Sequence, residues 1–244
     1  MSTGFLLTGN LITLFTGFSK TGIPGAGILA AILLANLTDH TRDSVGILLP
    51  LLLVADVFAI ATYRKHTDWR MIGRLLPPTL LGVAIGWWLL HRVDARAFGP
   101  LMGGLVLFQL LLDLLRRKLQ WTRAVHHPLA AVFFGVLTGV TTTLGNMAGP
   151  VMSLYLLSLG LDKQRFMGSM AWFFFLVNAI KIPIFAGTNL ITAESLQASL
   201  HLLPGVVIGA LVGRKLFRHI PPGPFQRLVQ LFAALAALRL LLIR

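Results

Sequence analysis

Apolar residues run along this chain in long stretches that are separated by short polar segments. Several stretches approach the roughly 20 apolar residues that a helix needs to cross a bilayer. We interpret six of them as spans: residues 45–63, 75–90, 98–115, 166–186, 196–217 and 225–243. The pattern predicts an all-α integral membrane protein.

Two further apolar regions are interrupted by glycine and polar residues. Residues 4–37 would form a helix of about 50 Å if they were continuous, which is too long for one crossing. The interruption divides them into half-helices at 4–18 and 28–37, each too short to span. Residues 127–140 and 151–161 repeat this arrangement. We expect each pair to dip into the membrane and return as a broken, re-entrant helix pair.

The chain also matches itself at a distance of 122 residues, half its length. Without a gap, this shift lays Thr16, Gly17, Thr21, Ala26, Gly27 and Gly46 on Thr138, Gly139, Thr143, Ala148, Gly149 and Gly168. After a loop difference of five residues, Pro77, Gly82 and Gly86 fall on Pro204, Gly209 and Gly213. We therefore predict two homologous repeats, 1–122 and 123–244, within a single transmembrane domain.

The basic residues test how the repeats are oriented. A re-entrant pair and three spans give each repeat an odd number of crossings, so the second repeat would be inverted. One side then receives Arg64, Lys65, Arg70, Arg74, Arg116, Arg117, Lys118, Arg123, Lys163, Arg165, Arg214, Lys215, Arg218 and Arg227, and the other receives only Arg42, Arg92, Arg96, Arg239 and Arg244. Because positive charge accumulates on the cytoplasmic side, this predicts an inner-membrane protein with both termini outside the cytoplasm.

Composition agrees with the membrane class and excludes other classes. Hydrophobic residues make up 56% of the chain and charged residues only 12%. The net charge of +13 lies in loops beside apolar spans, so it predicts no nucleic-acid partner. There is no cysteine, and the seven histidines have no metal-ligand spacing. We expect no metal and no cofactor.

Two lysines, Lys20 and Lys181, fall inside the apolar layer. A cation there is costly and normally faces a protein-lined or watery cavity that it serves. For Lys181, five or six residues before the end of its span, snorkelling to the interface is an alternative.

The neighbours of Lys20 favour a binding site for an anion. Glycines permit close approach of the backbone, hydroxyls and amides can replace a hydration shell, and the helices that follow each break direct their positive ends at the cavity. The predicted substrate-binding residues are Ser19, Lys20, Thr21, Gly22, Gly25, Gly27, Thr142, Thr143, Asn146, Asn178 and Lys181. The alternative is that the glycines serve only tight helix packing.

Asp56 is the only acidic residue deep in a predicted span, and its repeat mate is Asn178. Its carboxyl is a candidate for carrying a coupled proton, or it is the counter-ion of Lys20 or Lys181. Both interpretations remain open at this point. Asn178 lies one helical turn before Lys181, so we expect the two to share a wall of the cavity.

These features resemble the TauE/SafE-type sulfite exporter family of small bacterial membrane transporters. The resemblance is carried by TGFSKTGIPGAGILAAILLA and TGVTTTLGNMAGPVMSLYLLSLGLDKQRFMGS and by the two-repeat plan over nearly the whole chain. It implies transport of sulfite, sulfonates, thiosulfate or related sulfur-containing or carboxylate anions across the cytoplasmic membrane.

The leading hypothesis is therefore a secondary transporter, not an enzyme, that exports a small anion by alternating access around one central site. Coupling to H⁺ or Na⁺ and the oligomeric state are left open. An anion channel is the nearest alternative. An intramembrane hydrolase using Ser19 and Lys20 is a more distant one, because adjacent residues rarely place a base within about 3 Å of the nucleophile.

Overall fold

A computed structural model describes residues 3–22, 24, 26–38, 43–93, 97, 100, 101, 103–105, 107, 108, 111, 112, 115 and 127–217. The predicted span 225–243, and part of the predicted span 98–115, lie outside these residues. Throughout the described part the regular structure is helical, which confirms the all-α class. The elements are α1 (Thr3–Thr21), α2 (Gly27–Leu37), α3 (Asp43–Tyr63), the short 3₁₀ helix η1 (Arg64–His66), α4 (Trp69–Arg92), α6 (Pro128–Gly145), α7 (Gly149–Ser158), α8 (Lys163–Gly187) and α9 (Ala193–Leu216).

Five of the described segments are long and apolar enough to cross a bilayer: α3 with η1, α4, α6, α8 and α9. Large apolar side chains such as Leu81, Leu200 and Leu211 stand exposed on these helices, as lipid-facing residues do. The chain is therefore a multi-pass membrane protein. The shorter helices α2 and α7 contain 11 and 10 residues and are too short to cross.

The first helix of each predicted repeat is longer than the sequence pattern indicated. α1 continues to Thr21 and α6 to Gly145, whereas we expected ends at residues 18 and 140. Threonine hydroxyls near both ends bond to the carbonyl four residues earlier, from Thr21 to Gly17 and from Thr143 to Gly139, so these polar residues remain within the helix. The breaks shrink to the few residues between α1 and α2 and between α6 and α7.

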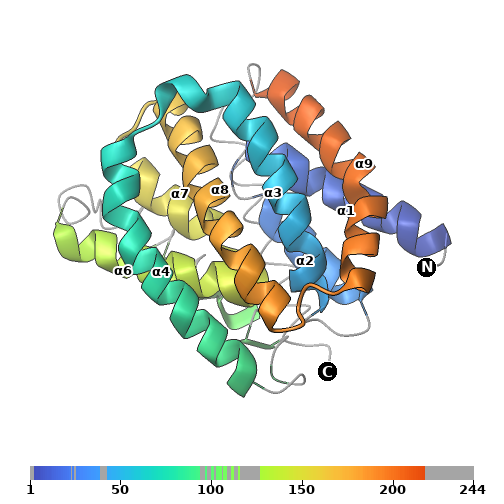
Figure 1. Cartoon of the computed structure of the whole chain (residues 1–244). Coiled ribbons are helices and arrows are strands. Elements are labelled where there is room, and N and C mark those ends of the chain that lie inside the picture. Colours follow the sequence, from blue (N-terminus) through green and yellow to red (C-terminus); the bar gives the residue numbers. More distant parts are fainter. Residues whose placement is uncertain are drawn as a thin grey trace.

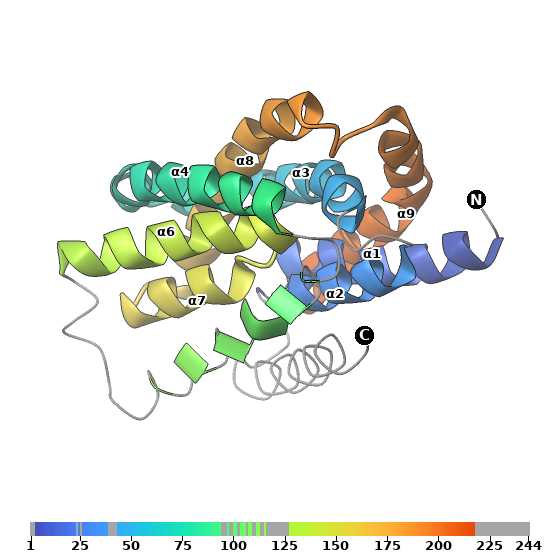
Figure 2. The same cartoon turned by 90° about the horizontal axis from the view of Figure 1, so that it is seen from below.

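The helices α1 and α6 begin on opposite sides of the molecule and run toward its middle (Figure 2). In Figure 2 the chain's N-terminal helix α1 enters from the right and α6 from the left, and both end near the middle of the molecule. α1 packs along α9, while α4 packs along α6 (Figure 1). The first helix of each predicted repeat therefore contacts a helix of the other repeat.

Glycines permit both of these close crossings. A Cβ added to Gly17 of α1 would collide with the backbone oxygen of Val206 in α9, and one added to Gly139 of α6 would collide with that of Thr79 in α4. Gly17 and Gly139 are 122 residues apart, and Thr79 and Val206 are 127 apart, the two offsets seen in the self-match. The two crossings are thus built by matching residues, which supports the duplication. The inversion of the repeats stays a prediction.

Candidate functional site

A small cavity lies where the two breaks meet. Residues of α1, α2 and α3 line one part of it, and residues around α7 and on α8 line the other: Ser19, Lys20, Pro24, Gly27, Ile28, Leu52, Asn146, Gly149, Met167, Met170, Ala171, Phe174 and Asn178. The cavity has a volume of ≈ 40 Å³, enough for a few atoms of a small ligand or for bound water. Gly27 and Gly149, the first residues of α2 and α7, both border it.

Lys20 is the cation of this cavity. Its Nζ lies 2.7 Å from Oδ1 of Asp56, and 15% of its side chain is exposed while the Asp56 side chain is fully buried. The ammonium also lies 4.2 Å from the centre of the Phe174 ring, within the range of a cation–π interaction. Lys20 is therefore held from one side by a carboxylate and from another by an aromatic face, with its remaining surface open to the cavity.

Asp56 and Asn178 join the two predicted repeats directly. Nδ2 of Asn178 on α8 donates to Oδ2 of Asp56 on α3 at 2.7 Å, and these residues are 122 positions apart. The other amide atom, Oδ1 of Asn178, is buried and has no hydrogen-bond partner among the described residues. The geometry makes Asp56 the counter-ion of Lys20, and whether it also carries a proton stays a prediction.

Lys181 does not share the cavity wall with Asn178, because its ammonium turns toward the end of α6. Nζ donates to the backbone oxygen of Thr142 at 2.8 Å, to Oγ1 of Thr142 at 3.0 Å and to Oδ1 of Asn146 at 2.7 Å. The side chain is fully buried, so it does not snorkel to the interface. Asn146 ends α6 in a left-handed conformation with φ of 55°, and its Nδ2 donates to Val45 O at 3.0 Å.

The helices that begin at the cavity lack side-chain caps. Neither α2 nor α7 has a cap hydrogen bond at its N-terminus. By contrast, Asp68, His127, Asp162 and Thr192 cap α4, α6, α8 and α9. The first N–H groups of α2 and the N–H of Gly149 therefore have no side-chain acceptor and, with the positive ends of the two helix dipoles, lie at the cavity, whereas Leu29 N–H donates to Ala26 O and Pro150 has no N–H.

The remaining predicted residues divide between cavity and packing. Ser19 and Gly27 line the cavity, and Ser19 Oγ lies close to the position of a Gly27 Cβ. Thr21 instead donates to Ala210 O at 2.6 Å, Gly22 packs against Gly213, and Thr143 bonds within α6. Gly22 therefore serves tight helix packing, which is the alternative given above for the glycines. Gly25 lies outside the described residues.

Sequence reasoning missed the apolar side of the cavity. Met167, Met170 and Phe174 of α8 lie at spacings of three and four residues and present one face to it. That spacing was visible in the sequence but resembled any buried helix face. Phe174 could have been noticed only by knowing that Lys20 approaches it.

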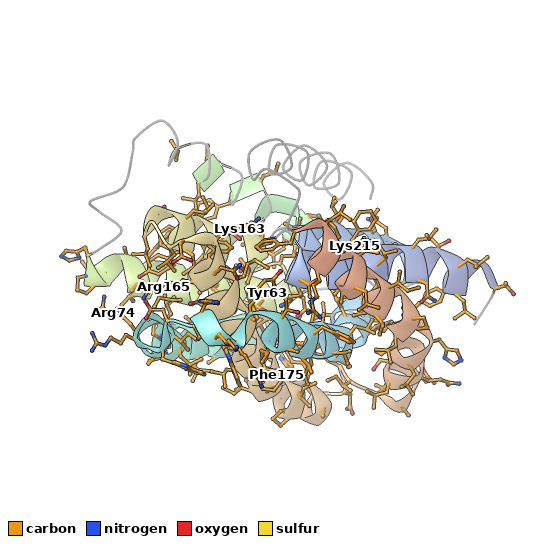
Figure 3. The ribbon with its side chains drawn as sticks, turned by 90° about the horizontal axis from the view of Figure 1, so that it is seen from above. Tyr63, Arg74, Lys163, Arg165, Phe175 and Lys215 are labelled. Atoms are coloured by element: carbon orange, nitrogen blue, oxygen red, sulfur yellow. The ribbon has the colours of Figure 1, made fainter. Side chains whose placement is uncertain are left out.

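Polar contacts also gather several basic residues at one end of the molecule. Lys163 donates to Phe217 O at 2.7 Å, Arg165 pairs with Asp68 at 3.3 Å, and the Tyr63 hydroxyl donates to Thr21 O at the end of α1. Figure 3 looks from above on the molecule and shows Lys163, Arg165 and Lys215 placed around Tyr63. These residues belong to the set that the charge pattern assigns to the cytoplasmic side.

Comparison with known proteins adds to this geometry. No solved structure matches the chain. The probable inner membrane transporter protein TsaS of Comamonas testosteroni is 28% identical to it over 169 residues, which are 67% of this chain and 68% of the relative. With five apolar helices of spanning length, this likeness identifies a multi-pass inner membrane protein. The family described as sulfite exporter TauE/SafE matches residues 9–240, and the chain therefore belongs to this family of membrane transporters.

Proposed function

We propose that the protein is a secondary transporter that exports a small oxyanion, with sulfite or a related sulfur-containing anion as substrate and the cavity between the two breaks as the binding site. One observation carries the proposal: the Lys20 ammonium and the uncapped N-termini of α2 and α7 all border one small cavity. A cation and backbone N–H groups without a side-chain cap are complementary to a compact negative charge. Membership in a sulfite exporter family supports the sulfur chemistry.

The anion would be held mainly by Lys20, the hydroxyl of Ser19, the N–H groups of Gly27 and Ile28 in α2 and the N–H of Gly149 in α7. Asn146 lines the cavity, but both of its amide atoms are already bonded, so it shapes the site and does not bind the substrate through its amide. Met167, Met170 and Phe174 close the other side. An apolar wall beside a few fixed donors is usual for small-ligand sites and excludes bulk water from the charge.

Asp56 would control access to Lys20. The carboxylate already neutralises the ammonium at 2.7 Å, so an incoming anion competes with it. Protonation of Asp56 would release Lys20 to the anion, which links anion binding to proton binding. This assigns Asp56 the coupling role, and alternating access would follow from movement of the elements around the two breaks.

The geometry disfavours the hydrolase alternative. A general base must have a free lone pair, whereas the Lys20 ammonium is paired with a buried carboxylate and directed at Phe174. A family of transporters and a relative described as a probable transporter point the same way.

The test is sulfite flux in proteoliposomes, with the variant Lys20→Met as the central measurement. We expect a loss of about 100-fold or more, because the buried carboxylate loses its partner and the anion loses its cation. The double variant Lys20→Met/Asp56→Asn removes both charges together and separates loss of fold from loss of binding. It should fold and remain inactive.

The matched control is Lys65→Met, which removes the same charge from exposed η1 and should leave flux unchanged. Unchanged flux in Lys20→Met would remove Lys20 from the mechanism. Single-channel currents in place of saturable counterflow would replace the transporter with an anion channel.

A further inference from the structure

The ammonium of Lys181 is enclosed by neutral oxygens. Its three hydrogen bonds go to one backbone carbonyl, one hydroxyl and one amide oxygen, at 2.8, 3.0 and 2.7 Å. These account for all three donors of the ammonium group. Among the described residues, no carboxylate lies within ion-pairing distance of Nζ, and the side chain is completely buried.

This coordination differs from what a structural lysine usually requires. A buried ammonium is normally balanced by a carboxylate, and Asp56 does this for Lys20. Around Lys181 the compensation comes from dipoles, because Thr142 and Asn146 stand at the C-terminal end of α6, where the helix dipole is negative. The ring of Phe185, with its centre 5.2 Å from Nζ, adds an aromatic face.

The acceptors are held in place independently of the lysine. Asn146 adopts the left-handed conformation that ends α6, and its Nδ2 is fixed by Val45 O of α3. This orients Oδ1 toward Nζ. The Thr142 carbonyl belongs to the last turn of the helix and also accepts from the backbone N–H of Asn146 at 3.0 Å. The cage is therefore preorganised by α3 and α6, while only the ammonium comes from α8.

We propose that this cage is a site for a monovalent cation of the sodium type, and that Lys181 occupies it permanently with a tethered ammonium. Backbone carbonyls at helix C-terminal ends are ligands that discontinuous helices of secondary transporters offer to Na⁺. The Thr142 hydroxyl and the Asn146 amide add two further neutral oxygens. The inference rests on the proposed function in one respect: it predicts that transport needs no sodium, because the position of a coupling sodium is already filled. Lys181 is then a positioning residue that holds α6 against α8 and does not contact the substrate.

The experiment replaces the tethered cation with a free one. Purified Lys181→Ala would be melted in NaCl and in choline chloride at equal ionic strength, and its binding of radioactive Na⁺ would be measured. We expect Na⁺ to raise the melting temperature of the variant by about 5 °C or more when it is well above its dissociation constant. The wild-type protein should melt at the same temperature in both salts and bind no Na⁺ above background.

Two further variants make the result specific to the cage. Lys181→Met fills the space with an uncharged chain and should be destabilised equally in both salts. Adding Thr142→Val to Lys181→Ala removes one oxygen ligand and should reduce the Na⁺ effect. The inference is overturned if Lys181→Ala shows no sodium-specific stabilisation, or if it cannot be folded in either salt.

This assay uses no anion, so its outcome is separate from that of the flux experiment. Sodium binding by Lys181→Ala without any anion flux would keep the cation site and reject the proposed function. Sulfite flux by the wild-type protein with no sodium binding by the variant would keep the proposed function and reject the cation site. Wild-type flux that requires Na⁺ would also contradict the inference.

Discussion

The two breaks match in position but hold their charge differently. In the first break the lysine is Lys20 of α1, which borders the cavity and pairs with a carboxylate on α3. In the second break its mate is Thr142, and the cation is Lys181 of α8, which is sealed among neutral oxygens. The two predicted repeats thus hold one cation that borders the cavity and one that is bonded to a helix end. A buried lysine alone does not indicate which role it has; its partners and exposure do.

The largest expected effect is on stability, at the two matching helix crossings of α1 with α9 and of α6 with α4. Gly17→Val and Gly139→Val each place side-chain atoms where Val206 and Thr79 present backbone, so neither crossing can close. We expect destabilisation of at least about 4 kcal/mol and loss of folded protein in both variants, measured by fluorescence-detected size-exclusion chromatography. Gly73→Ala is the control, because a Cβ there meets nothing within 4 Å. Tolerance of one substitution but not the other would show that the two crossings are not equivalent.

The next effect, on anion binding and proton-driven flux, concerns Asp56 and Asn178. At this matching position one predicted repeat has a carboxylate and the other has an amide. Asp56→Asn removes the competitor for Lys20, so we expect anion binding to tighten by about 10-fold at neutral pH. Flux driven by an imposed proton gradient should be lost, because the group proposed to carry the proton is gone. Binding is measured by isothermal titration and flux in proteoliposomes.

The exchange variant Asp56→Asn/Asn178→Asp sharpens this test by moving the carboxylate to the other half. Restored gradient-driven flux would mean that either half can carry the proton. Gradient-driven flux that persists in Asp56→Asn itself would reject the coupling role of Asp56.

The smallest effect distinguishes two matching threonines. Thr21 bonds across to Ala210 O of α9, whereas within the described part of the chain Thr143 bonds to Gly139 O of its own helix and to no other helix. Thr21→Val leaves a buried carbonyl without this donor and should cost about 1–3 kcal/mol, while Thr143→Val should cost less than about 1 kcal/mol. Thermal unfolding in detergent measures both. Equal costs would mean that the bond to α9 contributes nothing.

Much of this fold could be predicted because membrane insertion constrains hydrophobic pattern strongly. The apolar stretches at 45–63 and 166–186 fall within α3 and α8, and an interruption precedes each of the short helices α2 and α7. The ends of α1 and α6 could not be placed, because glycine and threonine are compatible with both a break and a closely packed helix. Contacts with α9 and α4 decide between these, and contacts between distant segments are not visible in local pattern.

The candidate site was predictable in its charged centre and not in its surroundings. Lys20 and Asn178 were identified because polar groups in an apolar layer are rare, and the offset of 122 already paired Asp56 with Asn178. Lys181 does not line this cavity beside Asn178, since spacing along α8 does not determine where a flexible four-carbon side chain is directed. Thr21 and Gly22 have the composition of a binding loop, yet they are used for packing.

The packing of α1 on α9 has a consequence for biosynthesis. Hydrogen bonds from Thr13 to Leu202 and from Thr21 to Ala210 each join residues 189 positions apart in the chain. At a synthesis rate of about 5–20 residues per second, the first helix must wait roughly 10 to 40 s for its partner to leave the ribosome. During that interval the hydroxyls of Thr13 and Thr21 have acceptors only within α1, at Asn10 O and Gly17 O, so the helix has to stay in the membrane on its own hydrogen bonds until α9 arrives.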